Sequence, residues 1–245
     1  MPVSPNPHLT SQHVCSHWLH GINAAFSPPF SPETRARLPR ALLHAPLKRQ
    51  REFLAGRWCA EKALQCLGIG STHIGMAEDR TPIWPDGVVG SITHTGEFAA
   101  AAVSWAVDIA ALGIDSEQII DNATACDIAE ICMVDEMSLF SAAHGPSIPE
   151  FCTFVFSAKE AVFKCLFPIT RKFLEFSDVR ITSLNWNRNR FTWTATFSET
   201  DGMGRLSCAN GMVHTSVELS CLGNLSRMET SRMLVQQIGA LHRSR

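Results

Sequence analysis

Apolar residues recur at helical spacing in two long stretches of the chain. In residues 47–68 they line one face of a helix, and Gly68 follows as a typical C-terminal stop. In residues 148–168 the apolar run is denser, Pro149 suits the first turn, and Pro168 ends the pattern. The pattern therefore predicts a long helix in each range.

A period of two residues predicts strands between and after these helices. Residues 90–104 have the pattern of two strands joined by a turn at Thr95 and Gly96, and residues 107–115 continue as an apolar strand. Alternating residues predict three later strands, and one more helix is expected in the second half of the chain. These elements are expected at residues 178–187, 190–198 and 211–221 for the strands and 123–145 for the helix.

Three segments lack strong periodicity. Residues 1–32 are rich in Pro, Ser and His and are expected to form an irregular lead-in, residues 78–87 predict a turn-rich loop, and residues 226–245 permit a terminal helix. Because each half of the chain pairs helices with antiparallel strands, we predict an α+β fold. Two α/β subdomains, residues 1–112 and 113–245, packed around a seam are a natural architecture for this pattern.

Composition narrows the class of protein. Of the 245 residues, 45% are hydrophobic and 18% are charged, and the formal net charge of −2 gives no case for binding nucleic acid or a membrane surface. No apolar run approaches the about 18 residues of a membrane-spanning helix, and the N-terminus lacks a signal-peptide pattern. Nine dispersed cysteines without a CxxC motif indicate reduced thiols in a cytoplasmic protein and argue against a zinc site.

Three carboxylates are candidates for metal binding. Asp115 and Glu117 lie two positions apart at a predicted strand end, so both side chains leave the same face. Glu160 follows 45 positions after Asp115, on a predicted helix. Neighbouring carboxylates repel each other unless a cation neutralises them, and Mg²⁺ prefers oxygen ligands. An isolated pair of acids at a strand end is more often two solvated charges, so the spacing alone leaves both interpretations open.

Basic residues are candidates for phosphate binding. Lys48, Arg49 and Arg57 lie close together on the first predicted helix, and Arg80 follows in the loop. Lysine and arginine side chains suit phosphate groups, although a solvated helix face is the commoner explanation of such a cluster. Arg57 is different, because it lies among small and apolar residues where a guanidinium needs a specific partner.

One histidine lies at a predicted strand end beside a glycine turn. This is His94, and its neighbours Thr93 and Thr95 carry small hydroxyls that suit the lining of a phosphate site. A lone histidine is more often structural than catalytic, so this position does not identify a site by itself.

Residues 156–164, FSAKEAVFK, allow two interpretations. Ser157 and Glu160 fit the S-x-x-E pattern of a capping box, which predicts that the helix begins at Ser157. If the helix instead begins near Pro149, then Ser157, Glu160 and Lys164 share one stripe. An exposed Glu160–Lys164 pair would contribute only about 0.3–0.5 kcal/mol to stability.

Taken together, these motifs identify a family. SITHTGEF, LGIDSEQI and FSAKEAVFK, in this order and at these separations, resemble the signature of the Sfp-type 4′-phosphopantetheinyl transferases. The similarity covers about residues 48–168, and its upstream part resembles the branch that serves siderophore synthases and also fatty-acid carriers. One departure is Ser116, since the family often has an apolar residue between the two acids.

The resemblance implies an activity and a site. Family members are pseudo-twofold α+β monomers that transfer the phosphopantetheine arm of coenzyme A to a carrier-protein serine and release 3′,5′-ADP. It implies Mg²⁺, with Mn²⁺ as the alternative, on Asp115, Glu117 and Glu160. Glu160, or a water that it orients, is the implied base, and Lys164 holds the pyrophosphate or the leaving group. The implied coenzyme A ligands are Lys48, Arg49, Arg57, Arg80, Thr93, His94, Lys159 and Lys164.

The resemblance also implies a carrier-protein partner, which is typically acidic and helical. Residues 126–140 are the candidate docking surface by position, although their own acidic residues would repel such a partner. Two other classes stay open: a binding module of the same fold without turnover, and a generic Mg²⁺-dependent nucleotidyl or phosphoryl enzyme. The intact acids and Lys164 argue against the first class, and the lack of a P-loop motif argues against the second.

Overall fold

A computed structural model describes residues 7–70, 72–141, 145–196 and 200–220. The terminal helix that the sequence permits at residues 226–245 lies outside the described residues. Within the described ranges, no helix combines the length and the apolar composition that crossing a membrane requires.

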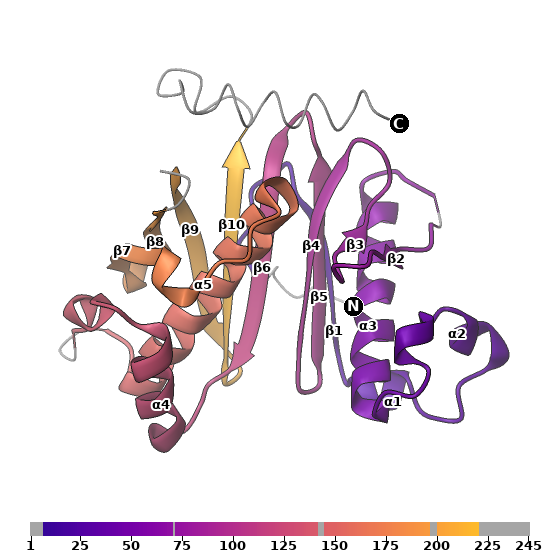
Figure 1. Ribbon diagram of the computed structural model, residues 1–245, viewed down its shortest axis with the longest axis horizontal. Helices are drawn as coiled ribbons and strands as arrows, with labels where there is room; N and C mark the ends of the chain where they lie inside the picture. The colour runs from indigo at the N-terminus through magenta and orange to yellow at the C-terminus, as the bar shows by residue number, and fades with distance from the viewer. Residues whose placement is uncertain (1–6, 71, 142–144, 197–199, 221–245) are drawn as a thin grey trace.

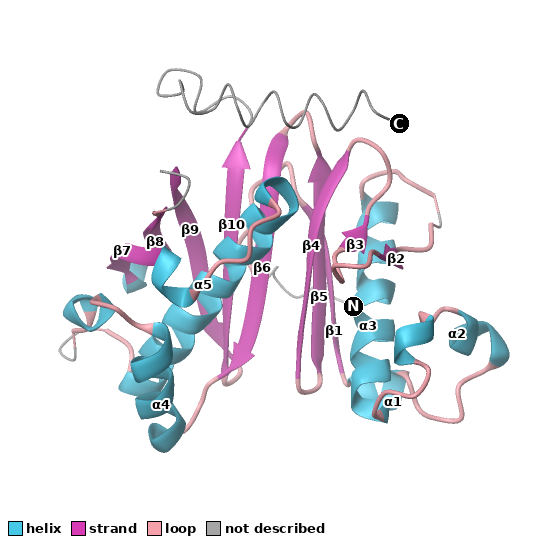
Figure 2. Cartoon of the chain, viewed as in Figure 1, coloured by secondary structure: helices cyan, strands magenta, loops and turns pink. Residues whose placement is uncertain are grey.

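Two antiparallel sheets stand side by side, and each carries one long helix (Figure 1). The first sheet has the strand order β1-β5-β4 and packs on α3, and the second has the order β6-β10-β9-β8-β7 and packs on α5. The helical and strand segments are shown separately in Figure 2. The predicted α+β class is confirmed, with helix and sheet in both halves.

The bounds in the first half are β1 Cys15–His20, α1 Ile22–Ala25, α2 Pro32–Ala36, α3 Leu47–Cys66, β2 Gly75–Met76, β3 Pro82–Ile83, β4 Val88–Thr95 and β5 Phe98–Trp105. Those in the second half are β6 Ile109–Gln118, α4 Asn122–Cys132, α5 Ile148–Thr170, β7 Val179–Asn185, β8 Arg190–Ala195, β9 Thr200–Ala209 and β10 Met212–Ser220.

The first half agrees with the pattern except at two places. The helix α3 and the hairpin of β4 and β5 are where the sequence predicts them. Residues 1–32 were expected to be irregular, but β1 pairs with β5 along its whole length, from Cys15 against Val103 to His20 against Phe98. The pattern is hidden because β1 packs on both of its faces, with Leu19 on one side and Trp18 on the other. The loop predicted at 78–87 contributes to the short ribbon of β2 and β3.

The helix α5 begins well before Ser157. Ser147 and Glu150 form a capping box, and Pro149 lies in the first turn, so the predicted start near Pro149 is confirmed and the alternative box at Ser157 is wrong. The predicted stop at Pro168 is also wrong, since the helix runs on to Thr170. Pro168 lacks only one hydrogen-bond donor so near the helix end, and Arg171 stops the helix with a φ of 53°.

The single helix predicted at residues 123–145 is instead two pieces. α4 ends at Cys132, and a 3₁₀ turn follows at Glu136–Leu139. Lys159 of α5 causes this break, because its ammonium group donates to the carbonyl of Cys132 at 2.7 Å and pairs with the buried Glu136 at 2.8 Å. A buried lysine thus ends α4 and fixes the turn that follows.

The strand β9 has no counterpart in the sequence prediction because two glycines interrupt its pattern. A Cβ at Gly202 would lie 2.8 Å from the indole of Trp193, and one at Gly204 would overlap the ring of Phe191. The aromatic rings of β8 therefore cover the places where β9 has no side chains. Alternation alone does not reveal a strand of this kind.

The seam between the sheets is formed by β4 and β6, which belong to different sheets but lie side by side. Ser91 of β4 accepts a hydrogen bond from the N–H of Ile114, and Thr93 accepts one from the N–H of Ser116. The chain passes between the sheets in the turn at 106–108, so the predicted boundary at 112/113 falls inside β6. Short hydroxyl side chains thus replace a backbone ladder at the seam.

Close packing of α5 on β6 depends on Gly113, and this predicts a large effect of one substitution. A Cβ at Gly113 would overlap the carbonyl oxygen of Ala161 and lie 2.7 Å from the backbone nitrogen of Cys165. We expect Gly113→Ala to lower the free energy of unfolding by about 3 kcal/mol, the upper end of the usual range for overpacking, in urea titrations. Gly70→Ala is the control, because no atom of the described residues lies within 4 Å of a Cβ at Gly70. Equal stability of the two variants would contradict the close approach.

Candidate active site

Asp115 lies at the centre of the seam. Its side chain is 2% exposed, and its Oδ1 accepts from the hydroxyl of Thr93 at 3.2 Å and from Nζ of Lys164 at 2.5 Å. Its Oδ2 is buried without a hydrogen-bond partner among the described residues. β4, β6 and α5 therefore converge on this one carboxylate.

The other two predicted acids lie close enough to Asp115 to interact with it. Glu117 accepts from the hydroxyl of Thr95 at 3.2 Å. Burial, together with repulsion from Asp115 and a smaller repulsion from Glu160, raises the pKa of Glu117 to about 7. Burial and the charge of Asp115 also raise the pKa of Glu160, although Lys164 opposes the shift. The predicted same-face placement of the acids is consistent with this geometry.

Lys164 is the counter-charge of the cluster. Burial by itself would lower the pKa of Lys164, but the carboxylates of Asp115, Glu160 and Glu117 outweigh burial and raise it. The ammonium group therefore stays charged. The rotation of α5 that brings Glu160 and Lys164 inward is fixed one turn earlier, where the hydroxyls of Ser157 and Thr215 of β10 lie 2.9 Å apart.

The acids offer a donor set that fits a hard divalent cation. They present only oxygen atoms, they hold more negative charge than Lys164 balances, and Oδ2 of Asp115 is a buried acceptor without a partner. Across the described ranges, no three His, Cys, Asp or Glu side chains already stand in the arrangement of a metal centre. Here the Lys164 ammonium group contacts Oδ1 of Asp115 instead.

His94 and Arg49 extend the site toward α3. Arg49 Nη1 lies 2.7 Å from Nε2 of His94, and because a guanidinium only donates, this ring nitrogen accepts and the ring proton lies on Nδ1. Burial, followed by the charges of Arg49 and Lys164, lowers the pKa of His94 to about 4, so the ring is neutral at pH 7. Glu52, which the sequence reasoning missed, lies 3.6 Å from Arg49 and 3.7 Å from His94. The sequence signal that could have revealed Glu52 is its position about one helical turn after Arg49.

Arg57 has the specific partner that its apolar surroundings required. Its guanidinium donates to the carbonyls of Ile74 and Gly75 at 3.0 and 3.2 Å and lies over the ring of Phe53. Burial, with a smaller effect of Arg49, lowers the pKa of Arg57 to about 10. In this structure Arg57 holds the segment before β2 against α3.

The remaining predicted basic residues are not brought to the carboxylates. Lys48 and Arg80 are exposed, and Arg80 has a φ of 68° in the loop between β2 and β3. Lys159 is 1% exposed, and its ammonium group is directed at Glu136 and the carbonyls of Cys132 and Phe176. A coenzyme cannot reach a buried lysine with these partners, so we leave Lys159 out of the binding set.

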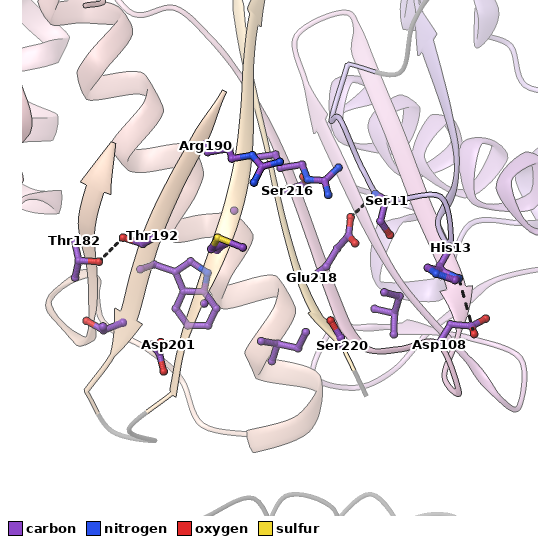
Figure 3. A pocket seen from close by; sticks show the side chains of 18 residues that line it. Ser11, His13, Asp108, Thr182, Arg190, Thr192, Asp201, Ser216, Glu218 and Ser220 are labelled. Carbon is purple, nitrogen blue, oxygen red and sulfur yellow. Dashed lines mark hydrogen bonds and ion pairs between the residues drawn. The ribbon is translucent and has the colours of Figure 1, made fainter. Parts of the chain in front are cut away.

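A groove of the described surface lies away from these residues. Figure 3 shows this groove, which has a volume of about 750 Å³ and is lined by residues of β7 to β10 and of the chain before β1, among them Arg190, Glu218 and Ser11. It contains none of the residues predicted for the site. Convergent charge, not hollow volume, therefore identifies the candidate active site.

Comparison with known proteins gives a consistent result. Residues 38–104 match the model of the 4′-phosphopantetheinyl transferase N-terminal domain, and residues 111–207 match that of the 4′-phosphopantetheinyl transferase superfamily. The chain is similar to the 4′-phosphopantetheinyl transferase Svp of Streptomyces mobaraensis, with 38% identity over 154 residues, 61% of this chain and 59% of the relative.

Two further relatives extend the match. The 4′-phosphopantetheinyl transferase PptT of Mycobacterium tuberculosis is 31% identical over 191 residues, 70% of this chain and 80% of the relative. Enterobactin synthase component D of Salmonella typhi is 38% identical over 139 residues, 56% of each chain. The matched segments thus span from 56% to 80% of these three relatives.

The raised pKa of Glu117 predicts a pH dependence of stability. The folded protein holds this proton up to about pH 7, whereas the unfolded chain releases it near the ordinary value of 4.5. In EDTA, the wild type should therefore lose stability relative to Glu117→Gln as the pH rises from about 4.5 to about 7, with no further change above. Urea titrations of both proteins across this range measure the difference. A difference that is constant with pH would contradict the shift.

Proposed function

Because this chain belongs to the 4′-phosphopantetheinyl transferase superfamily, we propose that it transfers the 4′-phosphopantetheine group of coenzyme A to a serine of a carrier protein. The observation that supports this most strongly is the convergence of Asp115, Glu117, Glu160 and Lys164 at the seam. These residues come from two elements of the chain and lie where a polyanionic substrate needs both a cation and a base.

Asp115, Glu117 and Glu160 are the residues that would hold a divalent cation, Mg²⁺ or Mn²⁺. When bound, the cation supplies positive charge that neutralises the pyrophosphate of coenzyme A and the charge that develops on the transferred phosphoryl group. Oδ2 of Asp115, buried without a partner among the described residues, supports its role as a ligand.

In this mechanism Glu160 takes up the proton of the carrier serine, and Lys164 stabilises the leaving group. Glu160 accepts the proton of the carrier serine at a carboxylate oxygen, directly or through one water. The serine oxygen bonds to phosphorus as the phosphorus–oxygen bond to 3′,5′-ADP breaks. Lys164 Nζ donates hydrogen bonds to the oxygens of the leaving phosphate, whose new charge it offsets.

The basic side of the seam binds the nucleotide part of coenzyme A. His94 lies near Asp115 and contacts Arg49, and Thr93 shares a hydrogen bond with Asp115. Lys48 and Arg80 are exposed and free to meet phosphate groups, and Arg57 acts by supporting the segment at Ile74 and Gly75. A neutral His94 offers a phosphate oxygen its Nδ1 proton.

Residues 126–140 form the docking surface for the carrier protein in this proposal. Ile131, Val134 and Met137 are 68%, 50% and 45% exposed, which is unusual for apolar side chains on one small surface. Two of the acidic residues that weakened this interpretation are neutralised within the fold, since Asp135 pairs with Arg180 and Glu136 with Lys159. The surface therefore repels an acidic partner less strongly than its sequence suggests.

The setting of the reaction is also part of the proposal. We propose that the protein acts as a monomer in the cytoplasm, which the free state of the eight described cysteines supports. Acyl and peptidyl carriers are both proposed as partners, and one of the relatives is a component of an enterobactin synthase.

The activity is tested by the mass of the carrier. Incubation with coenzyme A, Mg²⁺ and an apo carrier protein should add one phosphopantetheine group, seen by mass spectrometry. Glu160→Gln should lower kcat by about 100-fold or more, because the serine proton loses its acceptor. Asp86→Asn, an exposed acid outside the site, serves as the control and should keep wild-type rates. Coenzyme A binding without a mass gain on carriers of several classes would favour the binding-module alternative.

The docking surface is tested with a pair of matched substitutions. Ile131→Glu should raise the KM for the carrier about tenfold, because it removes apolar contact and adds repulsion, and should leave the KM for coenzyme A unchanged. Val107→Glu places the same charge on an apolar residue that is 80% exposed at the turn between β5 and β6. An equal rise in both variants would show that charge alone, not this surface, affects the carrier.

A further inference from the structure

Ser116 departs from the family pattern between the two acids, and it has partners of its own. Its side chain is fully buried and points away from Asp115 and Glu117, because alternate residues of a strand face opposite sides. Oγ of Ser116 lies 2.8 Å from Nε2 of His8 and 2.9 Å from Nδ1 of His214. One hydroxyl thus connects two histidines directly behind the carboxylates.

The histidines form a neutral chain with this hydroxyl. Burial lowers the pKa of His8 well below its ordinary value, and burial with the charge of His20 lowers the pKa of His214 to about 4. A serine hydroxyl has one proton, so it donates to one ring and accepts from the other. The two rings are packed edge to face at 5.3 Å, and Phe98 contacts both.

His8 belongs to the chain that crosses behind the seam before β1, residues 7–14, which we call the N-terminal strap. The strap is fixed to the second half of the molecule, where the hydroxyl of Ser216 donates to the carbonyl of His8 at 2.7 Å and the backbone N–H of Ser11 donates to Oε1 of Glu218 at 2.8 Å. Ser104 of β5, in the first half, donates to the carbonyl of His13 at 2.7 Å. Figure 3 shows Ser11, Glu218 and His13 along the groove beside this strap.

Hydrogen bonds to Thr93 of β4 also hold the backbone around Ser116, on the side opposite the strap. Thr93 accepts from the N–H of Ser116 at 3.1 Å and donates to Asp115 Oδ1 at 3.2 Å. The backbone between Asp115 and Glu117 is therefore clamped between β4 in front and the strap behind. A shift of Ser116 would move both carboxylates, because they are its direct neighbours in the strand.

We propose that His8, Ser116 and His214 are positioning residues that hold Asp115 and Glu117 at the separation needed for cation binding. This inference rests on the proposed function for the identity of the cation site. None of the three side chains touches substrate; they act through the backbone of β6. The strap thereby makes metal affinity depend on a segment far from the site in sequence.

The test measures cation binding directly, with Mn²⁺ as the probe. Free Mn²⁺ is followed by electron paramagnetic resonance in titrations of the protein with coenzyme A, well below the melting temperature. Ser116→Ala and His8→Leu should each raise the Kd for Mn²⁺ about tenfold. His8→Gln should restore most of the affinity, because the glutamine amide reaches the position of Nε2. The double variant of Ser116→Ala with His8→Leu should bind Mn²⁺ no more weakly than either single variant.

A matched variant separates positioning from general stability. Ser104→Ala removes an anchor of the strap without touching Ser116, so it should lower Tm and leave the Kd for Mn²⁺ unchanged. Wild-type affinity in folded His8→Leu, or an equal loss in Ser104→Ala, would overturn the proposal. If Ser116→Ala does not fold, the comparison of His8→Leu with His8→Gln still decides.

Amide hydrogen exchange without metal distinguishes this inference from the proposed function. Faster exchange at residues 115–117 in His8→Leu than in Ser104→Ala supports the clamp, and equal exchange contradicts it. Should the wild type bind no Mn²⁺ with coenzyme A, the proposed cation site fails, while the exchange result still reports on the clamp.

Discussion

The hydrogen bonds from β4 to β6 are the constraint on which the rest of the molecule depends. The two strands belong to different sheets, and Ser91, Thr93 and Thr95 reach across with hydroxyl groups instead of a backbone ladder. A hydroxyl can accept from a backbone N–H and donate to a carboxylate at the same time, as Thr93 does. The seam can therefore hold the two halves together and orient acids within one short stretch of chain.

The electrostatics of the seam explain why such precise support is needed. Asp115, Glu117 and Glu160 are partly or fully withdrawn from water, and the charge of Asp115 disfavours ionisation of Glu117 and of Glu160. Lys164 offsets part of this charge, but a buried cluster with unequal charge weakens a fold rather than strengthening it. The arrangement is consistent with the proposed cation site, and the apolar packing of α5 on β6 and β10 supplies the stability.

Much of this could be predicted from the sequence, and the failures have physical causes. The helices α3 and α5, the hairpin of β4 and β5, and the placement of Asp115 and Glu117 follow from periodicity and spacing. Glu52 was missed because its role depends on contact between α3 and β4, which no local pattern records. β9 was missed because rings on its neighbour replace side chains at Gly202 and Gly204. The partners of Ser116 were beyond prediction, since His8 and His214 lie at opposite ends of the chain.

Lys159 and Glu160 are adjacent in the motif, but their side chains face different parts of the molecule. Lys159 is directed into the contact with α4, where it pairs with Glu136, while Glu160 faces the seam. An alanine scan of this helix would lose activity at both positions for unrelated reasons. Under the proposed mechanism, the loss at Glu160 would be one of chemistry, whereas the loss at Lys159 would follow from collapse of the neighbouring surface. A measurement of folding would tell the two apart. Adjacency in a sequence motif is therefore no evidence of a shared task.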